Sequence, residues 1–246
     1  MKPIIAANWK MHKTRNEASG FCRSLLEDGH LFSNKDVLLC PPFTALEIVS
    51  ENIGGSEIKL GAQNMHWETS GAFTGEISAP MLLELGVEYV IIGHSERRHL
   101  MGETDEQINK KLKTALKHEL KPILCVGETE AEYEKGATET VIKDQLSKAM
   151  EGIADLKINE LIIAYEPVWA IGTGKAALPE DAEKAALLIH DMVRVLLGNE
   201  AASLLRVQYG GSVKSENIGS FMALSSVQGA LVGGASLEAD SFSALI

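Results

Sequence analysis

The sequence predicts an α/β fold, a single (β/α)8 barrel whose core is a closed sheet of eight parallel strands. Three observations predict it. Eight short apolar runs recur along the chain, segments with helical periodicity lie between them, and the length of 246 residues suits this fold. Runs that are apolar throughout are typical of parallel strands buried on both faces of a sheet. An open doubly wound sheet usually has a G-x-G-x-x-G turn after its first strand, and no such turn follows here. We therefore treat residues 1–246 as one catalytic domain.

The predicted strands are the apolar runs themselves. In chain order they are Ile4–Ala7, Val37–Cys40, Ile58–Ala62, Tyr89–Ile92, Ile123–Val126, Leu161–Tyr165, Leu205–Tyr209 and Gly229–Val232. Each run is followed by a polar or glycine-rich segment. Because all strands of a parallel barrel end at the same face, we expect these segments to meet there, where the active sites of such barrels are built.

Start and stop signals mark the helices between the strands. A threonine followed three residues later by Glu or Gln is typical of a capping box, in which the two side chains satisfy free backbone N–H groups. Three such pairs begin at Thr14, Thr104 and Thr129. The segment 104–119 has one apolar helical face, and we expect its lysines on the opposite face. Pro179 is expected to begin a helix that Gly198 ends.

Composition and charge exclude several classes of function. The formal net charge of −11 argues against nucleic acid or an anionic membrane as a partner. No apolar stretch approaches membrane-spanning length and the amino terminus has no apolar h-region, so we expect a cytoplasmic protein. Cys22, Cys40 and Cys125 form no C-x-x-C pair and are expected to be buried, reduced thiols. No H-E-x-x-H or His-x-His cluster occurs, so we expect no metal site.

Three strand ends carry side chains suited to proton transfer. Glu166 follows the sixth strand, where partial desolvation could raise its basicity toward the range of a general base. His94 follows the fourth strand and could act as an acid, a base or a hydrogen-bond donor. Lys10, beside Asn8 at the end of the first strand, could neutralise an anionic substrate and a developing negative charge. The alternatives are a solvated glutamate, a structural histidine and a solvated lysine.

Two glycine-rich turns favour a phosphate site. Gly210-Gly211-Ser212 follows the seventh strand and Gly233-Gly234 follows the eighth. Glycine allows the backbone N–H groups to approach phosphate oxygens closely, and phosphate sites of barrels commonly lie after these two strands. Either glycine motif alone would indicate only a tight turn and not a phosphate site. The segment Pro167–Ala177 has an apolar tip and a glycine-bearing end, which favours a lid over a plain surface loop.

These residues lie within longer stretches that resemble the triosephosphate isomerase family, and the resemblance covers essentially the whole chain. The matching stretches occur in the family's order and are Asn8–Met11, Gly61–Asn64, Gly71–Glu76, Ile91–Arg98, Tyr165–Lys175, Tyr209–Val213 and Leu231–Ala235. The family is itself a standard example of an enzyme with a closing lid.

The resemblance implies a cofactor-independent isomerase of glycolysis and gluconeogenesis. It would interconvert dihydroxyacetone phosphate and D-glyceraldehyde 3-phosphate through an enediolate, without a metal. Glu166 would move the proton between carbons, and a neutral His94, its pKa lowered by a helix amino terminus, would polarise the carbonyl and shuttle protons between the oxygens. Lys10 would stabilise negative charge, with Asn8 fixing its surroundings. The phosphate would be held by the backbone at Gly172, Ser212, Gly233 and Gly234.

The resemblance also implies a homodimer in which the loop Gly71–Glu76 inserts into the neighbouring subunit near Lys10, with Thr74 near the partner's active site. The sequence departs from the family's common residues at His12, at Ala79-Pro80 and at Ala176 in the lid. These departures concern the subunit interface and the lid rather than the reaction.

Two rival interpretations remain at this point. Another phosphate-binding barrel, such as an isomerase or lyase of amino-acid biosynthesis, would share the glycine turns but need not combine His94 with the Glu166 lid. A barrel that has lost catalysis is the second rival. The presence of Asn8, Lys10, His94 and Glu166 together argues against it.

Overall fold

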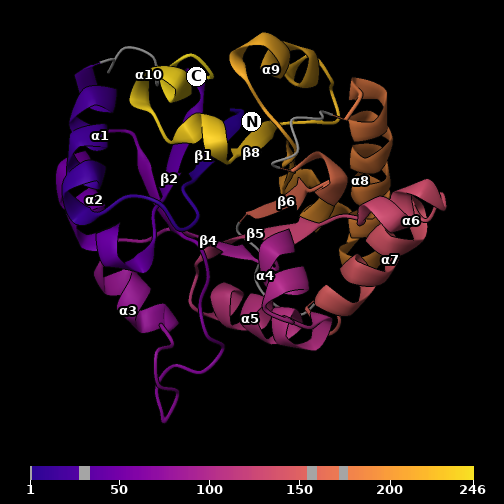
Figure 1. Ribbon diagram of the computed structural model, residues 1–246. Coiled ribbons are helices and arrows are strands. Elements are labelled where there is room, and N and C mark those ends of the chain that lie inside the picture. The colour runs from indigo at the N-terminus through magenta and orange to yellow at the C-terminus, as the bar shows by residue number, and fades with distance from the viewer. Residues whose placement is uncertain (1, 28–33, 154–159, 172–176) are drawn as a thin grey trace.

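Eight parallel strands close into a barrel in the computed structural model, which describes residues 2–27, 34–153, 160–171 and 177–246 (Figure 1). Each strand pairs with the next along the chain, and β1 pairs with β8 to close the sheet. The strands are β1 (Ile4–Asn8), β2 (Asp36–Cys40), β3 (Lys59–Ala62), β4 (Tyr89–Ile92), β5 (Lys121–Val126), β6 (Leu161–Tyr165), β7 (Leu205–Tyr209) and β8 (Gly229–Val232). The predicted (β/α)8 barrel is confirmed.

The predicted strand boundaries are correct for β4, β6, β7 and β8 and differ by one or two residues for the others. The largest difference is at β5, which begins at Lys121 rather than Ile123. The Lys121 N–H donates to the Glu88 carbonyl at 2.8 Å, so the ladder starts before the apolar run does. Pro122 fits there because it pairs with Val90 near the strand's first residue, where a missing N–H is tolerated.

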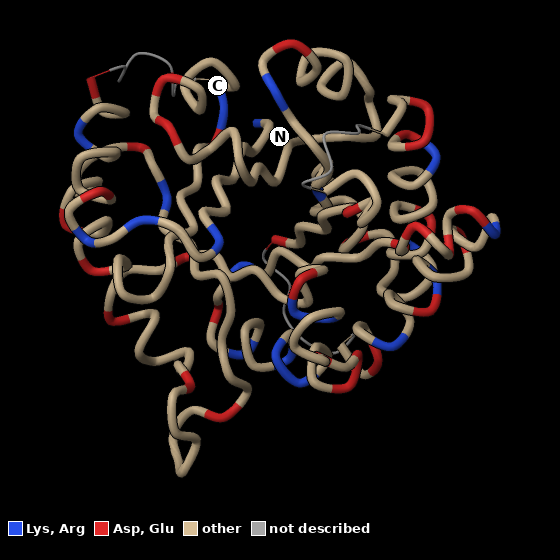
Figure 2. The backbone as a smooth tube through the Cα atoms, viewed as in Figure 1, with Lys and Arg blue, Asp and Glu red and all other residues tan. Residues whose placement is uncertain are grey.

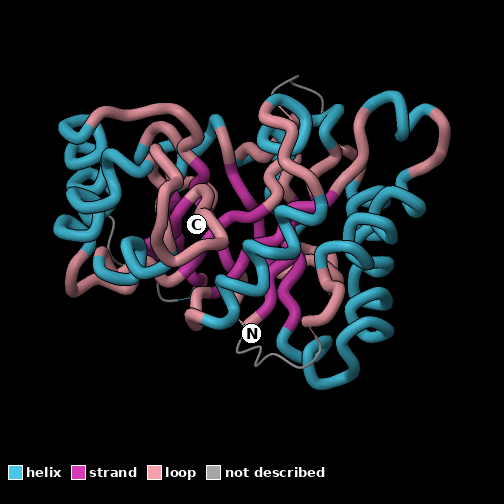
Figure 3. Tube along the Cα trace, turned by 90° about the horizontal axis from the view of Figure 1, so that it is seen from below, coloured by secondary structure: helices cyan, strands magenta, loops and turns pink. Residues whose placement is uncertain are grey.

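Helices surround the strands, as the end-on and turned views both show (Figures 1 and 3). The longer helices are α1 (Arg15–Glu27), α2 (Leu46–Ile53), α5 (Asp105–Lys117), α7 (Thr138–Ala149), α8 (Pro179–Leu204) and α9 (Ser215–Met222). The short ones are η2 (Phe43–Ala45), α3 (Ala79–Glu84), α4 (Ser95–Leu100), α6 (Glu130–Glu134), η3 (Val168–Ala170), η4 (Gly234–Ser236) and α10 (Ala239–Ser243). In the described part of the chain, no helix is both long enough and apolar enough to cross a bilayer.

Two apolar layers explain why each strand reads as a continuous apolar run. In β1, Ile4 and Ala6 belong to the cluster inside the barrel, whereas Ile5 and Ala7 belong to the layer between strands and helices. Side chains of a strand alternate between its two faces, and here both faces are buried. The inner cluster also contains Cys40 and Cys125, and all three cysteines are buried free thiols as expected.

The helix signals in the sequence are largely confirmed. The capping boxes at Thr104 and Thr129 are complete, and Thr14 exchanges the same two hydrogen bonds with Glu17. At Gly198 a φ of 83° leaves the helical region, as a helix end requires, but the chain becomes helical again up to Leu204.

One expectation about the helix faces is wrong. Lys111 of α5 is buried on the apolar side, with 3% of its surface exposed. Its ammonium group donates to Asn64 Oδ1 at 2.8 Å and forms an ion pair with the buried Glu103. Periodicity alone cannot find such a lysine, because the groups that satisfy it lie on other segments.

Candidate active site

A cavity of about 440 Å³ lies among the carboxyl ends of the strands. It is lined by seven of the residues that the sequence analysis selected: Asn8, Lys10, His94, Glu166, Ser212, Gly233 and Gly234. The eighth, Gly172, lies outside the described residues, as does the rest of the predicted lid's segment 172–176. The structure therefore brings together residues that are up to 226 positions apart in the sequence, counted from Asn8 to Gly234.

Glu166 lies at the centre of this arrangement and has 2% of its surface exposed. Its Oε1 lies 2.9 Å from His94 Nε2, and its Oε2 accepts a hydrogen bond of 2.9 Å from the Ser95 backbone N–H. Burial raises the pKa of Glu166, but His94, the Ser95 N–H and Lys10 together lower it below its ordinary value. The expectation of a raised basicity is therefore wrong for this arrangement, because both carboxylate oxygens have donors.

Glycines on the neighbouring strands leave space for this glutamate. A Cβ atom on Gly210, after β7, would lie 2.9 Å from Glu166 Cγ. A Cβ atom on Gly127, after β5, would lie 1.8 Å from the Glu166 carbonyl oxygen. A side chain at either position would thus displace the carboxylate or its backbone. The close approach of the three strand ends explains why glycine occurs at both positions.

His94 is the residue that precedes and caps α4. Its Nδ1 accepts a hydrogen bond of 3.3 Å from the Glu96 backbone N–H, so this nitrogen carries no proton. The proton of a neutral ring is then on Nε2, which donates to Glu166. Burial lowers the pKa of His94, whereas the Glu166 carboxylate raises it, and the net change is upward. This direction contradicts the lowered pKa that the family resemblance implied, because Glu166 is in contact with the ring.

Lys10 has a positive φ of 52°, which is uncommon for any residue other than glycine. Two side chains hold its backbone: Asn8 Oδ1 accepts from the Lys10 N–H at 3.1 Å, and Gln63 Nε2 donates to the Lys10 carbonyl at 2.9 Å. The ammonium group lies 2.7 Å from Glu96 Oε1. Such strain persists where neighbours fix the conformation, and it is frequent at functional sites.

The two arginines after β4 form ion pairs with acidic residues further along the chain. Arg97 contacts Glu103 at 2.9 Å, and Arg98 contacts Asp105 at 2.6 Å. They do not pair with Glu96, which contacts Lys10 instead. Both arginines therefore fix the chain around His94. Neither lines this cavity, although Arg97 lines a smaller neighbouring hollow together with Lys10 and His94.

The glycine turns supply backbone donors to the cavity. Within the described residues, the N–H groups of Ser212, Gly233 and Gly234 donate to no carbonyl or side chain. Acidic residues occur on helices all round the barrel (Figure 2), in keeping with the net charge of −11. An anionic group would therefore have to be held by local donors such as these N–H groups and Lys10.

The two ends of the predicted lid are attached to the barrel. At its start, Trp169 Nε1 donates to Glu128 Oε1 at 2.9 Å, and the same oxygen accepts from the Tyr165 hydroxyl at 3.0 Å. At its end, the Ala177 N–H donates to the Tyr209 hydroxyl at 3.2 Å. Sequence reasoning assigned no role to Glu128, Tyr209 or Gln63. Gln63 directly follows β3 and Glu128 lies two residues after β5, so the position rule could have found them. Tyr209 lies inside a strand and carries no such signal.

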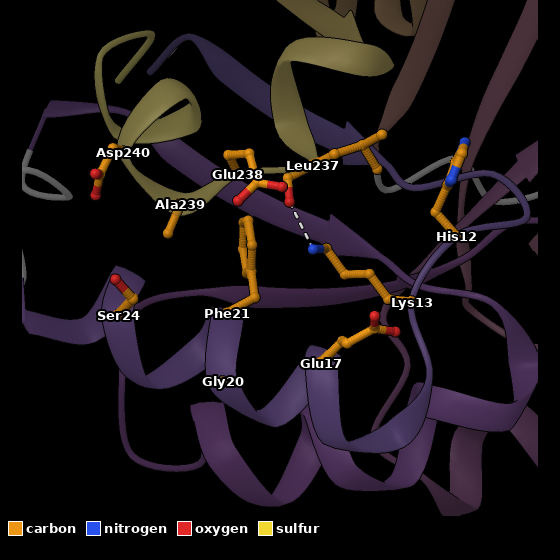
Figure 4. A pocket seen from close by; sticks show the side chains of 10 residues that line it. All are labelled: His12, Lys13, Glu17, Gly20, Phe21, Ser24, Leu237, Glu238, Ala239 and Asp240. Carbon is orange, nitrogen blue, oxygen red and sulfur yellow. Dashed lines mark hydrogen bonds between the residues drawn. The ribbon is translucent and has the colours of Figure 1, made fainter.

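A larger hollow of about 540 Å³ lies outside the barrel, between α1 and the chain at 237–240. Figure 4 shows Lys13 reaching across it toward the Leu237 carbonyl, to which its ammonium group donates at 2.5 Å. None of the predicted site residues lines this hollow. The convergence of strand ends, not volume, therefore identifies the candidate active site. Among the described residues, no three His, Cys, Asp or Glu side chains are grouped so that they could hold a metal ion.

Comparisons with known proteins agree with this geometry. The family model described as Triosephosphate isomerase matches residues 3–246. The triosephosphate isomerase of Carboxydothermus hydrogenoformans is 54% identical over 245 residues, which cover 100% of this chain and 98% of the relative. That of Dictyoglomus turgidum is 51% identical over 241 residues, covering 98% and 97%. That of Caldanaerobacter subterraneus subsp. tengcongensis is 50% identical over 248 residues, covering 100% and 98%.

Proposed function

Because the chain belongs to the triosephosphate isomerase family, we propose that Glu166, His94 and Lys10 perform its reaction, the interconversion of dihydroxyacetone phosphate and D-glyceraldehyde 3-phosphate. This aldose–ketose isomerisation is a step of glycolysis and gluconeogenesis and moves a proton between neighbouring carbons. The observation that carries the proposal is the contact of 2.9 Å between Glu166 and His94 at the wall of the cavity. It pairs a carboxylate base with a ring that can donate to an oxygen.

Glu166 acts as the base in this proposal. It removes a proton from C1 of dihydroxyacetone phosphate, which leaves an enediolate, and returns a proton to C2. To reach the carbon it must exchange its contacts with Ser95 N–H and His94 for the substrate. Loss of these donors removes two of the causes that lower its pKa, while burial, which raises it, remains. The carboxylate thus becomes more basic when it leaves its resting contacts.

His94 acts as the electrophile. Its Nε2–H is freed when Glu166 moves to the carbon, and it then donates to the carbonyl oxygen at C2. Transfer of this proton to the enediolate oxygen and recovery of another from the C1 hydroxyl complete the shuttle. The Glu96 N–H supports this role because it bonds to Nδ1 and fixes the neutral tautomer that has its proton on Nε2.

Lys10 and the backbone donors hold the anionic parts of the substrate. The ammonium group stabilises the enediolate charge, and Asn8 keeps the lysine backbone in place. The proposed phosphate donors are the N–H groups of Gly172, Ser212, Gly233 and Gly234. A Cβ atom on Gly233 would lie 3.3 Å from Lys10 Cε, which supports a tight fit between the two subsites. Apart from Gly172, which lies outside the described residues, these residues come from one barrel, which supports residues 1–246 as a single catalytic domain. We further propose that it acts in the cytoplasm.

The test is a coupled assay with glyceraldehyde 3-phosphate on the parent and on Glu166→Asp. Shortening the side chain withdraws the carboxylate from the carbon, and a misplacement of this size costs about a hundred-fold in rate. We expect kcat to fall by at least this factor, while the inhibition constant of inorganic phosphate changes little. Near-parental turnover of a folded Glu166→Asp protein would contradict the assignment of Glu166 as the base.

We also propose that the partner is a second copy of the chain, bound through the loop Gly71–Glu76. Residues 68–76 are all exposed, and the loop projects beyond α3 in Figure 1. Phe73 is 43% exposed although its ring packs on His66 with 4.4 Å between centroids. Near Lys10, Met11 is 95% exposed and Met101 is 68% exposed. An apolar loop and an apolar surface beside the cavity support a self-complementary interface.

Thr74→Glu tests this interface, because it places a charge within the loop. We expect sedimentation to show dissociation at concentrations where the parent is dimeric, together with a loss of activity on dilution. The control is Ser70→Glu, at the exposed edge of the loop. A parent protein that is monomeric and fully active at nanomolar concentration would rule out the dimer.

A further inference from the structure

Tyr133 of α6 has a contact with the chain that follows the proposed base. Its ring stacks on the indole of Trp169, with 4.4 Å between centroids and 30° between ring planes. Trp169 lies in η3, three residues after Glu166. Tyr133 is 39% exposed, so it does not fill the core, and its ring covers a tryptophan at the molecular surface. The contact therefore joins an outer helix to the segment that carries Glu166.

The indole is also held at its edge. Its Nε1 donates to Glu128, and the Val168 N–H donates to the Glu128 carbonyl at 3.0 Å. These bonds fix the position of the nitrogen, whereas the ring of Tyr133 limits the movement of the indole face. α6 itself is fixed at its start by the capping box of Thr129. Tyr133 is thus presented from a short helix whose own position is determined.

The phenol of Tyr133 reaches the chain beyond the other end of the predicted lid. Its neighbour there is Asp181, in the first turn of α8, and the charge of this carboxylate raises the pKa of Tyr133. Tyr133, Asp181 and Lys184 line the same surface groove. Tyr133 therefore contacts Trp169 on one side of residues 172–176 and shares a groove with Asp181 on the other.

We propose that Tyr133 is a positioning residue, which holds the Trp169 indole and, through η3, keeps Glu166 aligned with the substrate. The inference rests on the role proposed for Glu166. The base has to exchange its resting contacts for the substrate carbon, and η3 is the segment directly joined to it. Because the Tyr133 ring restricts the movement of Trp169, it raises the fraction of molecules in which Glu166 reaches the substrate carbon in a reactive geometry. Tyr133 itself does not touch the substrate and lines no part of the active-site cavity.

The magnitude follows from the contact. An aromatic pair of this kind shifts a conformational equilibrium by about two- to twelve-fold. We therefore expect Tyr133→Ala to lower kcat by about two- to twelve-fold, with KM nearly unchanged because the phosphate donors are untouched. Tyr133→Phe retains the ring and should restore most of kcat. Glu134→Ala, on the same helix and exposed, is the matched control and should behave as the parent.

A spectroscopic readout separates positioning from loss of structure. The chain has three tryptophans, so 5-fluorotryptophan labelling gives three fluorine resonances, which single Trp→Phe variants assign. In Tyr133→Ala the Trp169 resonance should shift, while those of Trp9 and Trp67 remain in place. In Tyr133→Phe the Trp169 resonance should stay close to its parental position.

Three results would overturn the proposal. They are parental kcat in Tyr133→Ala, equal losses in the Ala and Phe variants, or movement of all three resonances together. Glu166→Asp assayed in parallel keeps the two proposals apart. If Glu166→Asp loses activity and Tyr133→Ala does not, only the positioning role fails. If Glu166→Asp keeps activity, the failure lies in the assignment of the base.

Discussion

Both ends of the barrel bury charged side chains, but the two ends use them differently. At the amino end, Arg206 is 4% exposed and its guanidinium contacts Asp36 at 2.6 Å, the Lys2 carbonyl at 3.1 Å and Glu160. Its partners are opposite charges or carbonyls of the same chain. These contacts hold the starts of β2 and β7 together, and nothing at this end has to move.

At the carboxyl end, Glu166 is buried to a similar degree, yet its partners are an imidazole ring, which can lose its charge, and a backbone N–H. Hydrogen bonds to such donors can be exchanged for bonds to a substrate at little cost, whereas separating a buried ion pair is expensive. The comparison teaches that burial alone does not distinguish a structural charge from a catalytic one. The chemical type of the partner does.

The strongest test of this difference is the replacement of Arg206. Arg206→Leu leaves Asp36 and Glu160 without their cation, and removing one partner of a buried pair costs about 3 kcal/mol when the other groups are partly exposed. We expect the free energy of unfolding in urea to fall by about that amount, with kcat near parental at a temperature where the protein is folded. A large loss of kcat without a loss of stability would contradict the division between the two ends.

The space around Glu166 provides a second test. Gly210→Ala places a methyl group 2.9 Å from Glu166 Cγ and should lower kcat by about ten- to a hundred-fold through misplacement of the carboxylate. Gly219→Ala, in the exposed interior of α9, meets no atom within 4 Å and is the control. It should leave kcat unchanged and raise the free energy of unfolding by about 0.5–1 kcal/mol. Equal kcat values for the two variants would show that the site tolerates displacement of the base.

The smallest expected effect is on a titration. Burial lowers the pKa of His94, whereas Glu166 raises it, and the net change is a rise. Glu166→Gln removes the contribution of the carboxylate and keeps that of burial, so the pKa of His94 should fall. Nitrogen-15 NMR of the imidazole measures this, with assignment by His94→Asn. An unchanged or higher pKa in the variant would show that Glu166 does not control the ring.

The same variant has a defined effect on acid stability. The pKa of Glu166 is lowered from 4.5, so its charge stabilises the fold above that pH, and this contribution is lost as the pH falls through the folded-state value. Glu166→Gln lacks the titrating group. Its free energy of unfolding should therefore decrease less steeply below pH 4.5 than that of the parent.

The positions of the strands and of the site residues could be predicted because both depend on local patterns. An apolar run such as 161–165 identifies a strand, and the next residue, Glu166, then lies at the end where barrel sites are built. The same reasoning placed His94 and Lys10 at the cavity. It failed for Lys111, whose burial depends on Glu103 and Asn64.

By itself, the sequence determined the eight strands, their helices and which residues lie at the strand ends, since periodicity and capping are properties of short segments. Only the tertiary structure decided the partners of those residues. The Ser95 N–H and Glu166 are 71 residues apart, and Tyr133 meets Trp169 only because the barrel closes. The protonation of Glu166 and His94 depends on donors and charges that strand pairing brings within hydrogen-bond distance. Electrostatic interactions act through space, and no local pattern records which distant groups the closed sheet will place side by side.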